Sequence, residues 1–205
     1  MNELISTRTI SRRRCLRGIT AWLALVLLIA IPLPVSARAQ VSAQNSDEAL
    51  AYEVKASMMY HFLSFVQWPE DRDSAPFVVG VLGRDPFGPI LEKTFAGKTV
   101  QNREIQIRRF AELSELEPCH ILFVSRSERL RMSNIAEAAR DMGILTVGDM
   151  ERFAETGGMI GFKIESGKVR FEINLDVAKQ AGLEISSRLL RLATVRRQSA
   201  ASGRN

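Results

Sequence analysis

The chain has 205 residues, 46% of them hydrophobic, and its 28 Lys+Arg against 23 Asp+Glu give a formal net charge of +5. This composition excludes a disordered chain and a multi-span membrane protein, and two cysteines are too few for a disulfide-stapled miniprotein. The first 39 residues hold six arginines and one acid, which leaves 22 basic and 22 acidic side chains in residues 40–205. Residues 40–205 therefore carry no net charge, so long-range electrostatic attraction does not favour binding to nucleic acid.

Residues 1–39 have the organisation of a secretory signal peptide. Residues 18–35 carry no charge and follow an arginine-rich stretch, and Ala37 and Ala39 place small residues at the two positions that a signal peptidase reads. This order predicts cleavage after Ala39 and export to the periplasm of a bacterium. An uncleaved membrane anchor is the alternative, because the apolar stretch is just long enough to cross a bilayer core of roughly 30 Å.

The export route stays open between two alternatives. Residues 11–17 (SRRRCLR) resemble the twin-arginine signature, with Cys15 at the position usually held by phenylalanine. The very apolar run LALVLLIAI fits the general secretory route better. Cys15 precedes the apolar segment, so it is not a lipoprotein anchor.

The rest of the chain predicts one domain over residues 47–195, with a flexible lead-in at 40–46 and a disordered tail at 196–205. Apolar residues at helical spacing predict a first helix over 47–68 that ends at Pro69. The elements predicted next are strands at 77–82, 105–107, 121–124 and 144–147, with helices at 86–95 and 128–141. A hairpin over 159–174 turns at Glu165-Ser166-Gly167-Lys168, and helices near 176–181 and 187–195 close the domain.

Strands separated by helical patterns predict a three-layer α/β fold with a Rossmann-like, mostly parallel sheet. The C-terminal antiparallel hairpin is expected to form one edge of this sheet. Such a fold assigns no function by itself, so function has to be sought in particular residues.

Residues that commonly carry chemistry are sparse behind the signal peptide. His61 lies among Met and Phe residues of the first helix, and His120 begins a strand next to Cys119. The sequence has no C-x-x-C, H-x-x-x-H or H-E-x-x-H spacing for a metal and no G-x-S-x-G nucleophile motif. It therefore predicts a protein that is not an enzyme, with no catalytic residue, metal or cofactor. A hydrolase with an unrecognised site remains a third hypothesis.

Two other features leave alternatives open. Cys119 is the only cysteine behind the signal peptide, so it is either a buried thiol or the donor of an intermolecular disulfide. The first helix has more apolar residues than one stripe needs, among them Met58, Met59 and Leu63. These either extend the core or meet a partner chain.

Candidate binding residues lie where strands end. Gly83, Arg84 and Asp85 follow a predicted strand and open a helix, where backbone N–H groups can hold an anion, although ordinary turn glycines also explain the pattern. Arg126 follows the strand at 121–124, and ligands of such sheets bind at the carboxyl ends of the strands. Arg170 and Asn174 lie on the polar face of the last strand, which faces solvent, a ligand or a partner. Arg188, in the last helix, completes the ligand- or partner-binding set.

Several segments in order resemble the YfiR family of periplasmic proteins. They are Tyr52–Ala56 (YEVKA), Phe65–Pro69 (FVQWP), Val81–Gly88 (VLGRDPFG), Cys119–Ser125 (CHILFVS), Leu145–Asp149 (LTVGD) with 157–160 (GGMI), Val169–Leu175 (VRFEINL) and Ile185–Ala193 (ISSRLLRLA). Together they cover about residues 50–195.

The resemblance implies a non-enzymatic regulator that binds the periplasmic sensor domain of an inner-membrane diguanylate cyclase and represses it. It also implies an outer-membrane lipoprotein that sequesters the regulator, biofilm control through cyclic di-GMP, a homodimer and a small ligand. A periplasmic small-ligand sensor or carrier is the alternative. The best-known family member has a disulfide in the segment that here spans residues 148–155, where this chain has no cysteine. An internal redox switch is therefore not expected.

Overall fold

The computed structural model describes residues 36–69 and 76–196, with side chains from residue 47 onward. The chain divides into two compact units, Met1–Gln44 and Asn45–Asn205, and the fold described below is that of the second unit. Most of the predicted signal peptide (1–35) and of the predicted tail (197–205) lies outside the described residues, so both stay predictions. No helix among the described residues is long and apolar enough to cross a membrane.

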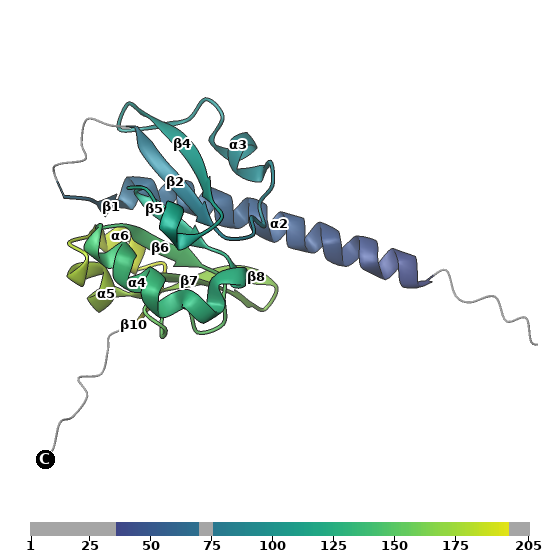
Figure 1. Ribbon diagram of the computed structural model, residues 1–205. Helices are drawn as coiled ribbons and strands as arrows, with labels where there is room; N and C mark the ends of the chain where they lie inside the picture. The colour runs from purple at the N-terminus through teal and green to yellow at the C-terminus, as the bar shows by residue number, and fades with distance from the viewer. Residues whose placement is uncertain (1–35, 70–75, 197–205) are drawn as a thin grey trace, which may run out of the picture. The chain divides into compact units, whose positions relative to one another are not determined.

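An eight-stranded mixed sheet forms the centre of the domain (Figure 1). Its order is β10 (Thr194–Arg196), β8 (Lys168–Asn174), β7 (Ile160–Glu165), β6 (Leu145–Gly148), β5 (Ile121–Val124), β2 (Phe77–Leu82), β4 (Arg103–Phe110) and β3 (Thr99–Val100). All neighbours from β4 to β7 are parallel, whereas β8 is antiparallel to β7 and β3 to β4. The predicted mostly parallel sheet with a C-terminal hairpin is confirmed. The chain leaves β2 toward β4 on one side of the sheet and leaves β5 toward β6 on the other side. The crevice between the carboxyl ends of β2 and β5 is the place where such sheets usually bind ligands.

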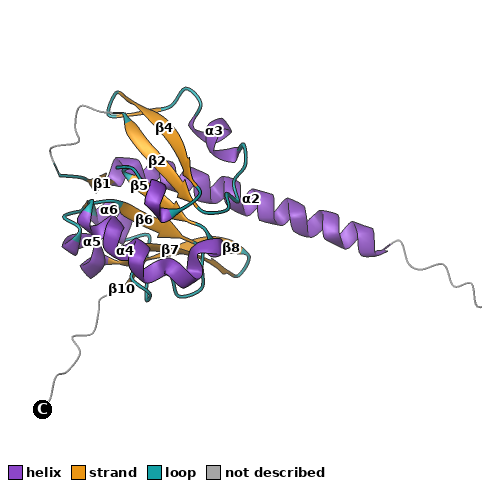
Figure 2. Cartoon of the chain, viewed as in Figure 1, coloured by secondary structure: helices purple, strands orange, loops and turns teal. Residues whose placement is uncertain are grey.

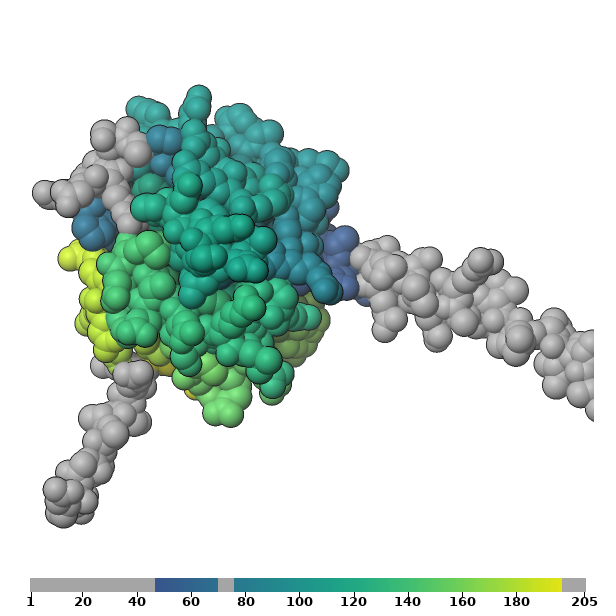
Figure 3. Space-filling model, viewed as in Figure 1, coloured from purple at the N-terminus to yellow at the C-terminus, as the bar shows by residue number. Residues whose placement is uncertain are grey.

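Helices cover both faces of this sheet (Figure 2). They are α2 (Ser36–Phe65), α3 (Ile90–Phe95), α4 (Met132–Asp141), α5 (Leu175–Gln180) and α6 (Ser187–Leu190), with 3-10 helices η2 (Leu113–Glu115) and η3 (Arg126–Arg131). On one face, Met59 and Leu63 of α2 pack against a core that includes Val79 of β2. On the other, Ile135 of α4 packs with Leu122 of β5, and the surface of this layer is visible in Figure 3. The predicted three-layer arrangement is thus confirmed.

Strands β2, β5 and β6 match their predictions because each is an apolar run buried on both faces. Every residue of β2, β5 and β6 is buried. The hairpin turns at Ser166 and Gly167, whose φ angles of 50° and 72° are those of a two-residue turn with both central residues left-handed. Cys119 is buried, with 1% of the residue exposed, which agrees with the buried-thiol alternative.

The first predicted helix is wrong at its C-terminal end. Helix α2 stops at Phe65, and Val66–Gln67 form strand β1, which pairs antiparallel with β9 (Glu184–Ile185). The Phe65 carbonyl accepts a hydrogen bond from the Ser186 N–H (2.9 Å), and the Trp68 indole donates to the His120 carbonyl (3.1 Å). These long-range bonds, invisible to helical periodicity, take the chain out of the helix before Pro69. At the other end, residues 40–46 lie within α2.

The last predicted helix is wrong beyond Leu190. Thr194–Arg196 form β10, which pairs parallel with β8, so the edge of the sheet is β10 and not the hairpin. Arg196, placed in the tail by composition, forms ion pairs with Glu155 (2.9 Å) and Glu172 (2.7 Å). Strand β10 has only three residues, which is too short for the alternation of apolar and polar residues that predicts a strand.

Candidate functional site

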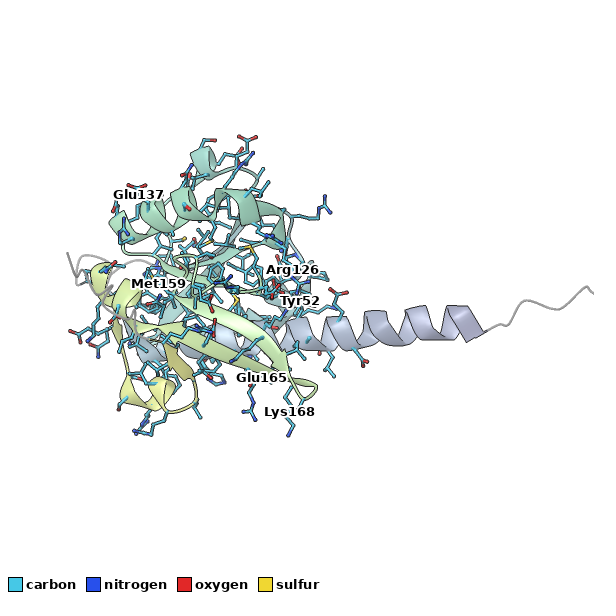
Figure 4. All side chains as sticks on the ribbon, turned by 90° about the horizontal axis from the view of Figure 1, so that it is seen from below. Tyr52, Arg126, Glu137, Met159, Glu165 and Lys168 are labelled. Carbon is cyan, nitrogen blue, oxygen red and sulfur yellow. The ribbon has the colours of Figure 1, made fainter. Side chains whose placement is uncertain are left out.

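A buried charge cluster lies where β5 and β6 end. Asp149 follows β6 directly and Arg126 begins η3 after β5, while Tyr52 and Lys55 come from one turn of α2. Figure 4 shows Tyr52 and Arg126 side by side at this place. The carboxyl ends of parallel strands share one edge of the sheet, which is why residues so distant in sequence converge here.

The Asp149 carboxylate accepts four hydrogen bonds from three side chains. Lys55 Nζ lies 2.6 Å from Oδ2, and the Tyr52 hydroxyl donates to the same oxygen at 2.9 Å. Arg126 donates from Nε to Oδ1 (3.1 Å) and from Nη2 to Oδ2 (3.2 Å). The Asp149 and Lys55 side chains are only 3% and 5% exposed, whereas that of Arg126 is 63% exposed. Asp149 thus ties α2 and η3 to the end of β6.

The partners of Asp149 fix its protonation state. Burial alone raises the pKa of Asp149, but Lys55, Tyr52 and Arg126 together outweigh it and lower the pKa below its ordinary value. Burial first, and the Asp149 charge second, raise the pKa of the Tyr52 phenol well above its ordinary value. At neutral pH the cluster therefore holds a carboxylate, a protonated phenol and two cations, a net charge of +1. The Asp149 carboxylate is engaged by all three partners, so the cluster is suited to anchoring.

Two cavities open on either side of Arg126. One, of about 600 Å³, is the arginine cavity, lined by Arg126, Arg129, Asp149, Met150, Glu151, Arg152, Glu155, Phe162, Lys163, Glu172 and Arg196. The other, of about 770 Å³, is the hairpin groove between α2 and the tip of the β7–β8 hairpin, lined by Asp47, Glu48, Leu50, Ala51, Tyr52, Val54, Lys55, Arg126, Ile164, Gly167, Lys168 and Val169. Arg126, held by Asp149, is thus the wall that both cavities share.

The predicted residues Gly83, Arg84 and Asp85 lie at the crevice where the sheet connections reverse. The Arg84 N–H donates to Ser127 Oγ (3.0 Å), and a Cβ on Gly83 would lie 2.7 Å from the Glu128 carboxylate. The crevice is therefore filled by η3 side chains of the chain itself. Asp85 accepts hydrogen bonds from the Phe87 N–H and from Arg109 Nε (2.7 Å each), so it shapes the loop and anchors β4.

The other predicted residues do not converge with Arg126. Asn174 is buried at the far end of β8, where it caps α5 through the Val177 N–H (3.2 Å) and donates to the Ala154 carbonyl (2.8 Å). Arg170 is exposed on β8 opposite Lys163, and Arg188 is exposed on α6. Of the seven predicted residues, only Arg126 belongs to the buried cluster.

Sequence reasoning missed Tyr52, Lys55 and Asp149 as site residues. Two features of the sequence point to them: Lys55 lies on the apolar stripe of its helix, one turn before Met59, and Asp149 directly follows a buried strand. A charged residue in either place needs a partner. No group of three His, Cys, Asp or Glu side chains suited to a metal ion occurs in the part of the chain that the structure describes.

Comparison with known proteins places this chain in a family. A family model described as YfiR/HmsC-like matches residues 52–194, a range that contains all four residues of the cluster. The chain belongs to the YfiR/HmsC-like family. Members of this family regulate cyclic di-GMP signalling. The sequence resemblance is thereby confirmed at the level of the family.

A solved structure supports the fold. The crystal structure of a conserved domain protein from Vibrio cholerae superposes with a TM-score of 0.50 at 12% sequence identity. The match covers 70% of this chain and 59% of the Vibrio chain, so this chain spans about three-fifths of that protein's length. No curated protein matches this chain. At this identity the likeness concerns the fold alone.

Replacing Asp149 with Asn should strongly destabilise the YfiR/HmsC-like domain. The substitution leaves Lys55 buried without its anion, and breaking a buried pair costs roughly 3–5 kcal/mol. Lys55→Met should cost less, because Tyr52 and Arg126 still hold the carboxylate. Urea unfolding measures both, with Asp141→Asn as the control, since the Asp141 side chain is 71% exposed and should change stability by less than about 0.5 kcal/mol. A loss below about 1 kcal/mol for Asp149→Asn would contradict the structural role of the cluster.

The stability difference between wild type and Asp149→Asn should depend on pH. The pKa of Asp149 is lower in the folded protein than its unfolded value of about 3.9. Its stabilisation is therefore complete above that value and is lost as the pH falls through the lower, folded value. We expect a constant difference between about pH 7 and pH 5 that shrinks below about pH 4. Urea unfolding of both proteins across this range measures it, and a difference that does not shrink in acid would refute the assignment.

Proposed function

We propose that this protein is exported to the periplasm, binds the periplasmic sensor domain of an inner-membrane diguanylate cyclase and holds the cyclase inactive. The observation that carries the proposal is the YfiR/HmsC-like match over residues 52–194, which spans nearly the whole of the unit from Asn45. The signal-peptide pattern of residues 1–39 supports the location. The buried Asp149 cluster and the two open cavities beside it favour a protein that works by binding rather than by covalent chemistry.

Repression by binding shifts the cyclase population from its active to its inactive form. The regulator lowers cyclase activity only to the extent that it binds the inactive sensor more tightly than the active one. Moving a cyclase from 99% active to 99% inactive requires a preference of about 10⁴-fold, equivalent to about 5.5 kcal/mol. An outer-membrane lipoprotein that sequesters the regulator would reverse the shift by lowering the free concentration of the regulator.

An affinity-tagged full chain, expressed with its own leader in its native bacterium, should recover a cyclase from detergent-solubilised membranes. The recovered protein should combine a periplasmic domain with a cytoplasmic diguanylate cyclase domain, identified by mass spectrometry. A tagged chain that lacks residues 1–39 and stays in the cytoplasm is the control and should recover none. Repeated recovery of no cyclase by the exported chain would sink the partner assignment.

A periplasmic small-ligand sensor is the second candidate, and the arginine cavity favours it. Five cationic and four acidic side chains line this cavity of about 600 Å³, and Arg126 and Arg129 reach it from η3 at the carboxyl edge of the sheet. Arg126 shares the single charge of Asp149 with Lys55, so the cluster has one positive charge in excess. An organic anion is the ligand class that such a cavity suits best.

Thermal-shift screening with nucleotides, amino acids and small carboxylic acids tests this second candidate. A ligand at 100 times its dissociation constant should stabilise the folded protein by about 2.7 kcal/mol. Arg129→Gln should reduce the shift, and Arg191→Gln, which changes an exposed arginine outside the cavity, should leave it unchanged. No stabilisation by any member of the panel would count against a sensor of this class.

A further inference from the structure

The 3-10 helix η3 presents a leucine between two arginines to solvent. Leu130 is 97% exposed, the largest exposure of any large hydrophobic residue in the described chain, and Arg129 and Arg131 on either side of it are exposed as well. The next large apolar residues along the chain, Met132 and Ile135, are buried in the core. A single leucine on a surface is ordinary, but this one is enclosed by cations on both sides.

The outward position of Leu130 follows from the helical pattern. Helix η3 runs directly into α4, and buried side chains recur along both at helical spacing: Glu128, Met132, Ile135 and Ala139. Leu130 lies two residues from Glu128 and two from Met132, so it falls on the side of this helical run that faces away from the core. Burying Leu130 would therefore turn Glu128 and Met132 out of the interior.

The charge of η3 is positive. Its sequence, RSERLR, holds three arginines and one glutamate, which gives a net charge of +2. The glutamate, Glu128, is buried and lies 3.5 Å from Arg131, while Asp149 holds Arg126. The side chains of Arg126 and Arg131 nevertheless stay 63% and 59% exposed, so both remain accessible to an anion outside the protein.

We propose that η3 docks on the surface of an anionic phospholipid bilayer. The Leu130 side chain inserts at the boundary between headgroups and acyl chains, and Arg129 and Arg131 lie at the level of the phosphates. Arginine suits this place because its alkyl stem can lie along an apolar layer while its guanidinium pairs with phosphate oxygens at two points. Apolar side chains combined with cations are the means by which peripheral proteins hold to such surfaces.

The shape of the site favours a lipid surface over a protein. Leu130 lines neither the arginine cavity nor the hairpin groove, and almost its whole surface is exposed. A partner protein would need a pocket fitted to this one leucine, whereas lipid headgroups part around a projecting side chain. Binding through one leucine and a few arginines is weak and reversible, since the affinity grows with the buried apolar area and with each cation near the surface. The inference concerns this chain and a lipid surface, so it holds or fails independently of any cyclase.

Co-sedimentation with large unilamellar vesicles tests the proposal. The protein purified after expression of the full chain should bind vesicles of equal parts phosphatidylglycerol and phosphatidylcholine in about 0.1 M NaCl, and phosphatidylcholine vesicles at least about tenfold more weakly. In about 1 M NaCl, where the Debye length is about 3 Å, binding to the anionic vesicles should fall at least about tenfold. Leu130→Ser and Arg129→Gln should each lower the partition coefficient about fivefold.

Residues 191 and 192 supply a matched control, because they repeat outside η3 the arginine–leucine order of residues 129 and 130. Leu192 is 68% exposed but has a cation on one side only, with Ala193 on the other. Leu192→Ser and Arg191→Gln should leave the partition coefficient unchanged, and thermal melts confirm that every variant is folded. Absence of binding to the anionic vesicles, equal binding to both lipid compositions, binding that survives Leu130→Ser, or an equal loss with Leu192→Ser would each overturn the proposal.

Discussion

The buried pair of Lys55 and Asp149 is the interaction on which the carboxyl edge of this domain depends. Placing two charges where their side chains are only 5% and 3% exposed costs desolvation that the 2.6 Å contact must offset. The two further donors, the Tyr52 hydroxyl and the Arg126 guanidinium, complete the coordination of the carboxylate. Because an apolar pair of equal size would often be as stable, the benefit of this pair lies in fixing one arrangement of α2 against the sheet.

Both surfaces available for binding follow from that arrangement. Arg126 is a mostly exposed arginine whose guanidinium is nevertheless held at two points by a buried carboxylate. It forms one wall of the arginine cavity and one end of the hairpin groove. Any change that frees Arg126 would therefore alter both surfaces together.

The elements that the sequence predicted well are those whose signal is local. Strands such as 77–82 and 121–124 are uninterrupted apolar runs, and runs of this kind are buried on both faces of a parallel sheet. The two helix ends that were wrong, after Phe65 and after Leu190, depend on pairing with residues far away in the chain: β1 with β9, and β10 with β8. Periodicity carries no information about such pairing.

The residues of the candidate site also differ in whether a local sequence signal predicts them. The carboxyl ends of the strands do hold part of the site, since Arg126 lies there, but residues 83–85 line a crevice that Glu128 already fills. The sequence does not show that Lys55 and Asp149 pair, because the two residues lie 94 positions apart and only the fold brings their charges together.

The regulatory account is tested most directly by the cellular level of cyclic di-GMP, measured by mass spectrometry in the native bacterium with and without this gene. The account predicts that deleting the gene raises cyclic di-GMP, and that the rise disappears when the partner cyclase loses its periplasmic domain. An unchanged level after deletion, or a rise that persists without that domain, would contradict repression through the periplasmic sensor.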